Sequence, residues 1–257
     1  MLPRRFRSLA IYTLSVGLSF VFMQSSQASA QTDNTNDKTK TETGQPVLSK
    51  ENTAILETCF KCHGAGGVSQ IPTHPTIAGQ KAGYLVKQLN EFRRSQEILS
   101  EQAATQSANQ EDEKQAVSGR SDFIMNHMVS GLSKNNFTSL AVYISLLPCD
   151  GNANPDNNDI DQGEKIPKAP NVVARCVSCH GENGISSQPN VPNLAGQRRA
   201  YLRRELLMMR ETAWGGNNLN KNEWRGHPIM EQQSARLRIE DVDSISNYFS
   251  QLNCRSK

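Results

Sequence analysis

The sequence predicts an all-α fold built from two copies of one unit. Two Cys-x-x-Cys-His motifs, at residues 59–63 and 176–180, lie 117 residues apart. The same offset pairs later residues, including Ala78-Gly79-Gln80 with Ala195-Gly196-Gln197, which indicates an internal repeat. Apolar residues recur at helical spacing after each motif, whereas no segment shows a sustained alternation of apolar and polar residues. Strands are therefore not expected.

The repeat continues past an insertion in the first copy. From Arg120 onwards the offset is 105 residues, which pairs Met125 with Met230 and Cys149 with Cys254. The difference between the two offsets is 12 residues. We place these extra residues in the polar stretch 100–118, as an exposed loop.

Three helices are expected in each copy from the spacing of apolar residues. Those of the first copy cover residues 53–60, 82–95 and 136–147. Those of the second copy cover residues 171–177, 199–210 and 240–252. The first helix of each copy leads into the cysteine motif, so the motif is expected at a helix end.

The amino terminus is typical of an export signal at residues 1–30. Three arginines precede an apolar run of residues 9–23, and Ala28-Ser29-Ala30 fits a small-residue cleavage site, so cleavage after Ala30 is expected. An uncleaved signal anchor, which would associate the protein with a membrane, is the alternative. The protein is expected in the periplasm.

Composition divides the remainder of the chain. Residues 31–48 are polar with little that is apolar and are expected to be a disordered tail. The two domains are expected at residues 49–150 and 168–257, joined by a linker at 151–167 that is rich in Asn, Asp, Pro and Gly.

The charge balance excludes a general polyanion binder. The chain has 28 basic and 25 acidic residues, but three of the arginines lie in the signal segment, which leaves 25 of each sign. Nucleic acid is therefore not an expected partner. Residues 168–257 hold 13 basic and 8 acidic residues, so we expect the second domain to meet an acidic partner surface.

The duplicated motif predicts two covalently bound haem c groups. A c-type haem needs two thiols one helical turn apart for thioether bonds and a histidine directly after them to bind the iron. The residues that meet this need are Cys59, Cys62 and His63 in the first copy and Cys176, Cys179 and His180 in the second. The alternative is a zinc site or a disulfide formed by the two cysteine pairs, but this leaves both histidines unexplained.

Met125 and Met230 are the candidates for the opposite axial position. They occupy equivalent places in the repeat, whereas His74, His127 and His227 do not. A thioether ligand suits low-spin iron and raises its reduction potential relative to a second imidazole. The alternative is that both methionines only fill the core.

Other repeated residues suggest supporting roles. A backbone carbonyl at Pro72 or Pro75, and at Pro189 or Pro192, is a candidate acceptor for the Nδ1 proton of the adjacent histidine. Two further sets have roles that the sequence does not settle. Arg120 and Arg225 either pair with a haem propionate or are solvated surface charges, and Tyr84, Tyr143, Tyr201 and Tyr248 are expected to pack helices together.

Cys149 and Cys254 lie at equivalent positions near the ends of the last helices. In an oxidising compartment they are able to bridge the two domains if their Cα atoms lie within about 7 Å. The sequence does not establish that distance.

Taken together, the duplicated motifs resemble the dihaem cytochrome c4 family over residues 50–254. The resemblance is carried by Cys-x-x-Cys-His, a Pro-x-[Ile/Leu]-Ala-Gly-Gln block, a Tyr-Leu helix and an Ile-Met pair seven residues before a Leu. It implies two class I cytochrome c domains related by pseudo-twofold symmetry, with His63 and Met125 on one iron and His180 and Met230 on the other. It also implies electron delivery to a terminal oxidase.

Three functions are open at this stage. The first is a carrier that exchanges electrons with redox proteins, such as a membrane oxidase or a quinol-oxidising complex, and has no small-molecule substrate. The second is the cytochrome subunit of a flavocytochrome c sulfide dehydrogenase. The third is an enzyme, such as a thiosulfate dehydrogenase or a dihaem peroxidase. An enzyme should have an unusual or vacant axial position, and two matched methionines speak against it.

Overall fold

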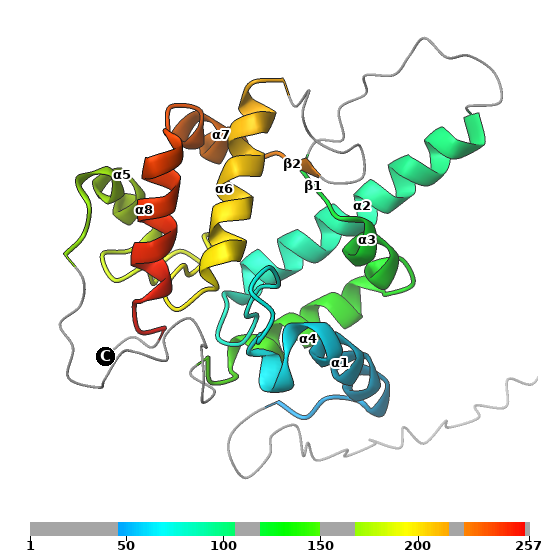
Figure 1. Ribbon diagram of the computed structural model, residues 1–257. Coiled ribbons are helices and arrows are strands. Elements are labelled where there is room, and N and C mark those ends of the chain that lie inside the picture. Colours follow the sequence, from blue (N-terminus) through cyan, green and yellow to red (C-terminus); the bar gives the residue numbers. More distant parts are fainter. Residues whose placement is uncertain (1–45, 106–118, 150–167, 216–223, 255–257) are drawn as a thin grey trace, which may run out of the picture. The chain divides into compact units, whose positions relative to one another are not determined.

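Two similar sets of helices follow one another along the chain (Figure 1). The computed structural model describes residues 46–105, 119–149, 168–215 and 224–254. The expected signal segment at 1–30, most of the tail expected at 31–48 and the linker expected at 151–167 lie outside the described residues. Within these limits no helix is long and apolar enough to cross a membrane.

Each repeat contributes four helices, a short 3₁₀ turn and one short strand to the described residues. The first repeat holds α1 (Lys50–His63), η1 (Ala65–Gly67), α2 (Ala82–Thr105), β1 (Arg120–Ser121), α3 (Phe123–Val129) and α4 (Lys134–Ser145). The second holds η3 (Asn171–Val173), α5 (Ala174–His180), α6 (Arg199–Ala213), β2 (Trp224–Arg225), α7 (Pro228–Ser234) and α8 (Ile239–Ser250). The mostly helical fold is as predicted.

Helix α2 is ten residues longer than predicted. It continues to Thr105, so residues 100–105 are helical and the expectation of a loop over 100–118 is wrong for this part. The added residues, Gln96 to Thr105, are mainly Gln, Glu, Ala and Leu, which favour helix on a solvated face even without an apolar stripe. Residues 106–118 lie outside the described part of the chain.

Helices α3 and α7, which carry Met125 and Met230, were not predicted. Each has seven residues, about two turns, which is too short for helical periodicity to emerge. Their starts are fixed by caps instead. The Asp122 side chain accepts from the backbone N–H groups of Ile124 and Met125, and α7 has Pro228 at its first position.

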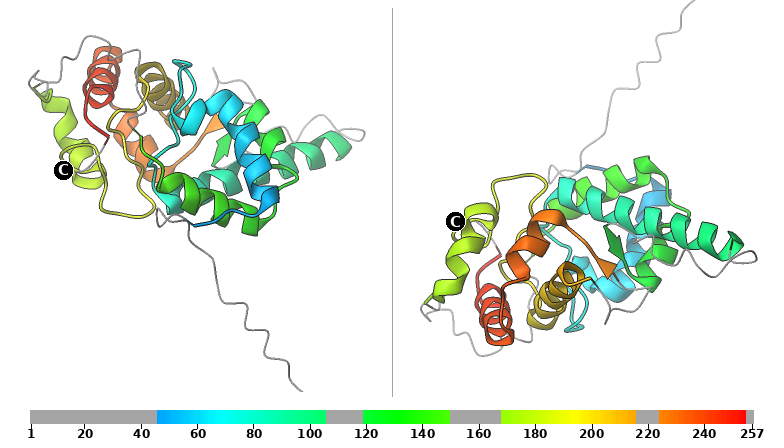
Figure 2. Two further views of the ribbon diagram at one scale, coloured as in Figure 1. Left: turned by 90° about the horizontal axis from the view of Figure 1, so that it is seen from below. Right: turned by 90° about the horizontal axis from the view of Figure 1, so that it is seen from above.

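A two-residue antiparallel ladder joins the repeats, contrary to the expectation of no strands. Arg120 of β1 pairs with Arg225 of β2, its own equivalent in the repeat, and Ser121 pairs with Trp224. The right-hand view of Figure 2 shows the two strands as adjacent green and orange arrows. Strands of two residues have no period that a sequence pattern could reveal.

Each repeat has its own apolar core. In the first, α2 packs on α4 around Leu85, Leu140 and Ile144. In the second, α6 packs on α8 (Figure 1). Val242 and Phe249 are fully buried in this core. Burial of each such large side chain stabilises the fold by roughly 1.5 to 3 kcal/mol. All described residues belong to one compact unit, so the boundary between domains 49–150 and 168–257 remains a prediction.

Candidate functional site

The two Cys-x-x-Cys-His motifs form the last turns of α1 and α5. Each helix ends at its motif histidine, and the next residue, Gly64 or Gly181, has a positive φ. A Cβ at either glycine would collide with a backbone carbonyl, of Val68 or Ile185. The glycine therefore turns the chain sharply back, directly after the histidine, as only glycine does without strain.

The two cysteines of each motif differ in exposure. Cys59 and Cys176 are half-buried, whereas Cys62 and Cys179 are exposed. Before a haem is attached, burial raises the pKa of the Cys59 and Cys176 thiols. The described residues contain no group of three or more His, Cys, Asp or Glu placed to bind a metal ion. No disulfide joins the four motif cysteines, all of which lie in the described residues.

Both motif histidines are anchored by a proline carbonyl, which confirms that prediction. Nδ1 lies 2.9 Å from the Pro75 oxygen in His63 and 2.9 Å from the Pro192 oxygen in His180. Because a carbonyl only accepts, Nδ1 must carry the proton, and Nε2 keeps its lone pair for a metal. The other two repeated prolines have a different role, described below.

Burial also keeps these imidazoles neutral. Only 8% of His63 and 6% of His180 is exposed. Burial lowers the pKa of each ring, and the hydrogen bond to the proline carbonyl offsets this only in part. A neutral imidazole with a fixed tautomer is the form that binds iron, so this donor set fits a covalently attached haem.

The methionine-bearing helices each pack on a longer helix of their own repeat. Met125 contacts the cluster of Phe92, Val129 and Phe137, and α3 packs on α2 as α7 packs on α6. Burial, the largest influence, lowers the pKa of the His63 ring, and the negative charge of Asp122, the N-cap of α3, raises it. Axial ligation by the methionines remains a proposal.

The repeated Ala-Gly-Gln block crosses from one repeat to the other. Gln197 Oε1 accepts from the Thr76 N–H at 2.8 Å, and its Nε2 donates to the Thr76 carbonyl at 2.9 Å. Likewise, Gln80 Oε1 accepts from the Asn193 N–H at 2.8 Å, and Gln80 Nε2 donates to the Asn193 carbonyl at 3.0 Å. The repeat marks this block, but the sequence predicts no role for it. Because both copies carry the same residues, the sequence does not reveal whether a repeated side chain contacts its own unit or the other.

The outer prolines complete this symmetric surface. The Pro72 carbonyl accepts from the Tyr201 N–H, and the Pro189 carbonyl accepts from the Tyr84 N–H, both at 3.1 Å. Equivalent residues thus exchange equivalent hydrogen bonds, which is the signature of a twofold, isologous contact.

The two repeated arginines are buried between the repeats, so the interpretation as solvated surface charges is wrong. Only 8% of Arg120 and 4% of Arg225 is exposed. The side-chain oxygen of Gln88, Oε1, accepts from Nη1 of Arg120 at 2.8 Å and from Nη1 of Arg225 at 2.7 Å. Glu205 lies 2.9 Å from Arg120 Nη2 and 2.8 Å from Arg225 Nε.

Two tyrosines join this network besides packing helices. Arg120 donates to the Tyr201 hydroxyl at 2.8 Å, and Arg225 donates to the Tyr84 hydroxyl at 3.2 Å. Burial lowers the pKa of Arg120, but the Glu205 carboxylate and the hydroxyls of Tyr201 and Tyr84 together outweigh burial, so the pKa is raised. The guanidinium is therefore permanently charged and compensated mainly by Glu205. Pairing with a propionate is neither required nor tested by these contacts.

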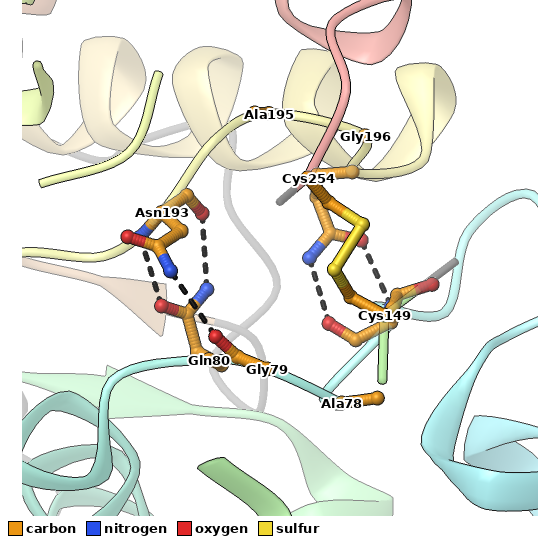
Figure 3. Close-up of a pocket in the computed structure, with 10 residues that line it drawn as sticks. Ala78, Gly79, Gln80, Cys149, Asn193, Ala195, Gly196 and Cys254 are labelled. Carbon is orange, nitrogen blue, oxygen red and sulfur yellow. Dashed lines mark hydrogen bonds between the residues drawn. A yellow bond between two sulfur atoms is a disulfide. The ribbon is translucent and has the colours of Figure 1, made fainter. Parts of the chain in front are cut away.

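A disulfide between Cys149 and Cys254 closes the same surface (Figure 3). Their Cα atoms lie 6.1 Å apart, within the range that a disulfide requires. The Ala-Gly-Gln glycines leave room for it, since a Cβ at Gly79 would lie 3.1 Å from Cys149 Cβ and one at Gly196 would lie 2.9 Å from Cys254 Cβ. The two repeats are thus joined by a covalent bond as well as by symmetric hydrogen bonds.

Comparison with known proteins agrees with this geometry. A family model for cytochrome c matches residues 163–253. Cytochrome c4 of Azotobacter vinelandii is 30% identical over 200 residues, covering 76% of this chain and 84% of that protein. A thiosulfate dehydrogenase electron acceptor of Thiomonas intermedia (strain K12) is 26% identical over 72% of this chain and 73% of its own length. The crystal structure of reduced recombinant cytochrome c4 from Pseudomonas stutzeri aligns with a TM-score of 0.54 at 24% identity, covering 80% of this chain and 99% of that one.

Proposed function

The chain belongs to the cytochrome c4 family, and from this membership we propose that it is a periplasmic carrier that delivers electrons to a terminal oxidase. It is a dihaem cytochrome c and holds two covalently bound haem c groups. When bound, each haem supplies a reversible one-electron couple. The observation that carries the proposal is the pair of buried histidines, each fixed by a proline carbonyl in the same geometry.

We assign each residue of the candidate site one role. The thiols of Cys59 and Cys62, and of Cys176 and Cys179, attach the two haems. His63 and His180 would hold the irons through Nε2, and Met125 and Met230 would supply the second protein ligand of each iron. Two protein ligands on each iron would leave no open position for a substrate, which favours a carrier over an enzyme.

A methionine variant series tests this assignment. Met125→Leu and Met230→Leu should each remove half of the methionine-to-iron charge-transfer band and lower one of the two midpoint potentials. Met128→Leu is the matched control, because Met128 is exposed on the same helix as Met125 and has no counterpart in the second repeat. A band of half strength in the unaltered protein would contradict the assignment and favour an enzyme.

A second candidate function is that of an electron acceptor for a thiosulfate-oxidising enzyme. It is favoured by the similarity to the Thiomonas intermedia protein, whose name describes that role. Rapid mixing with a thiosulfate dehydrogenase and, separately, with a terminal oxidase distinguishes the two. The proposed carrier of an oxidase is oxidised rapidly by the oxidase, whereas an acceptor is reduced rapidly by the dehydrogenase in the presence of thiosulfate.

The charge of the second repeat bears on docking. Its excess of five basic residues should attract an acidic surface and raise the association rate. We therefore expect the rate of electron transfer to the partner to fall as ionic strength rises. A rate of electron transfer that does not change with ionic strength would contradict attraction between the second repeat and an acidic partner surface.

A further inference from the structure

We propose that Gln197 and Gln80 are positioning residues that each tune the haem of the opposite repeat, through the peptide group that anchors its histidine. The inference rests on the proposed haem ligation by His63 and His180. It concerns a coupling between the repeats that runs through three hydrogen-bonded groups.

The first relay begins at the side chain of Gln197 in the second repeat. Its Oε1 accepts from the Thr76 N–H at 2.8 Å. That N–H belongs to the same peptide group as the Pro75 carbonyl, because residues 75 and 76 are consecutive. The Pro75 carbonyl in turn accepts from His63 Nδ1 at 2.9 Å. A single peptide thus links a side chain of one repeat to the iron-binding imidazole of the other.

The second relay is the mirror of the first. Gln80 Oε1 accepts from the Asn193 N–H at 2.8 Å, and the Pro192 carbonyl of the same peptide group accepts from His180 Nδ1 at 2.9 Å. Both glutamines are buried, with 7% of Gln80 and 6% of Gln197 exposed. Water therefore competes little with either hydrogen bond.

Each glutamine is held so that its oxygen, not its nitrogen, faces the peptide N–H. Gln197 Oε1 also accepts from the Arg198 N–H at 3.0 Å, and Gln80 Oε1 accepts from the Lys81 N–H at 2.9 Å. The amide nitrogens donate to the carbonyls of Thr76 and Asn193. All partners of both amides agree with one orientation, so the relay has a fixed direction.

The physical effect follows from the polarisation of the peptide. An acceptor on the N–H makes the carbonyl of the same group a stronger acceptor, because hydrogen bonds in a chain polarise one another. A stronger bond at Nδ1 makes the imidazole a more basic ligand, which favours the ferric iron and lowers the midpoint potential. Loss of Gln197 should therefore raise the potential of the haem on His63, and loss of Gln80 that of the haem on His180.

The two glutamines are each other's matched control. Gln197→Met and Gln80→Met remove equivalent hydrogen bonds from the same surface, so both weaken the contact between the repeats to a similar extent. A purely structural role would give the two variants the same redox behaviour. Tuning across the repeats predicts that the two variants affect different haems. Gln197→Met should raise only the midpoint potential of the haem on His63, and Gln80→Met only that of the haem on His180.

The experiment is a redox titration of the haem-loaded protein followed by proton NMR, in which each haem is assigned from contacts with its own repeat. We expect a shift in the reduction equilibrium of about threefold at the opposite haem, where tenfold corresponds to about 59 mV for one electron. The axial-histidine Nδ1 proton of that site should shift as well. If Gln197→Met and Gln80→Met fail to fold, Gln197→Glu and Gln80→Glu replace them. These variants keep the acceptor oxygen with added negative charge and should lower the midpoint potential of the haem in the opposite repeat.

Equal shifts at both haems, a shift at the haem of the same repeat, or no shift would each overturn the relay. These outcomes are distinct from failure of the proposed function. If the unaltered protein lacks histidine ligation by NMR, the proposed function fails. If histidine ligation is present at both sites and the crossed shift is absent, only the relay fails.

Discussion

Replacing Glu205 by Gln should destabilise the protein strongly, although it removes a single charge. Glu205 is the carboxylate nearest both buried arginines, at 2.9 Å from Arg120 and 2.8 Å from Arg225. Its side chain is 10% exposed. Removing one partner of a buried ion pair typically costs 3–5 kcal/mol, because the other charge stays buried without compensation.

The remaining carboxylate places the expected cost at the low end of that range. Glu91 lies 3.6 Å from Arg225 Nη1, but its side chain is 18% exposed. It therefore offsets only part of the two positive charges. We expect the free energy of unfolding of Glu205→Gln, from urea titration followed by circular dichroism, to fall by about 3 kcal/mol.

Two further variants make the test specific. Asp243→Asn breaks an ion pair with Arg203 at 2.6 Å, but those side chains are 40% and 42% exposed, so its cost should stay below about 1 kcal/mol. The double variant Gln88→Glu/Glu205→Gln moves the carboxylate to the equivalent position of the other repeat. It should recover only part of the loss, because the new carboxylate would face Glu91, whose Oε2 accepts from Gln88 Nε2 at 2.8 Å. A Glu205→Gln protein as stable as Asp243→Asn, or a double variant no better than the single one, would refute the reasoning.

Three other changes have definite expected outcomes. Gly196→Ala should lower the free energy of unfolding by about 1–3 kcal/mol, because the residue has φ 67° and the new Cβ would lie 2.9 Å from Cys254 Cβ; urea titration measures this. Asp122→Ala removes the cap of the Met125 helix and should cost about 1 kcal/mol and lower the midpoint temperature of the charge-transfer band on heating. Tyr201→Phe should flatten the loss of stability above pH 10, measured by urea titration at several pH values.

The sign of the tyrosine effect follows from its environment. Burial, despite the nearby Arg120 charge, raises the pKa of Tyr201 above its usual value of 10.0. Above pH 10 the unfolded chain loses this proton and the folded protein keeps it, so unfolding releases a proton and stability falls as pH rises. Below pH 10 the two proteins should differ only by the lost hydrogen bond to Arg120, and a pH dependence that is unchanged by the variant would contradict the assignment.

The helices and motif residues were predictable because their signals are local. The apolar spacing along 82–95 and 199–210 reports one face of a helix, and the doubled Cys-x-x-Cys-His motif reports its own geometry. The proline acceptors were also predictable, because prolines recur at the same distances after each motif histidine, which indicates a role shared by both copies.

The contacts between the repeats were not predictable from one sequence. Gln80 and Gln197 stand at equivalent places, and the pattern is the same whether each serves its own unit or the other. The same ambiguity made Arg120 look like a surface charge, since its partners Glu205 and Tyr201 are more than 80 residues away. The seven-residue helices α3 and α7 were not predicted for a different reason, because two turns are too short to show a helical period.

The disulfide gives the chain a closed covalent topology. Cys149 and Cys254 are separated by 105 residues, and the whole second repeat lies in the ring that they close. A single protease cut between residues 150 and 167 would open the ring but leave both pieces in one molecule. Closing a ring of about 100 residues lowers the entropy of the unfolded chain by an amount equivalent to about 4.7 kcal/mol. A nicked protein should therefore run as one species until a thiol reductant separates it into two.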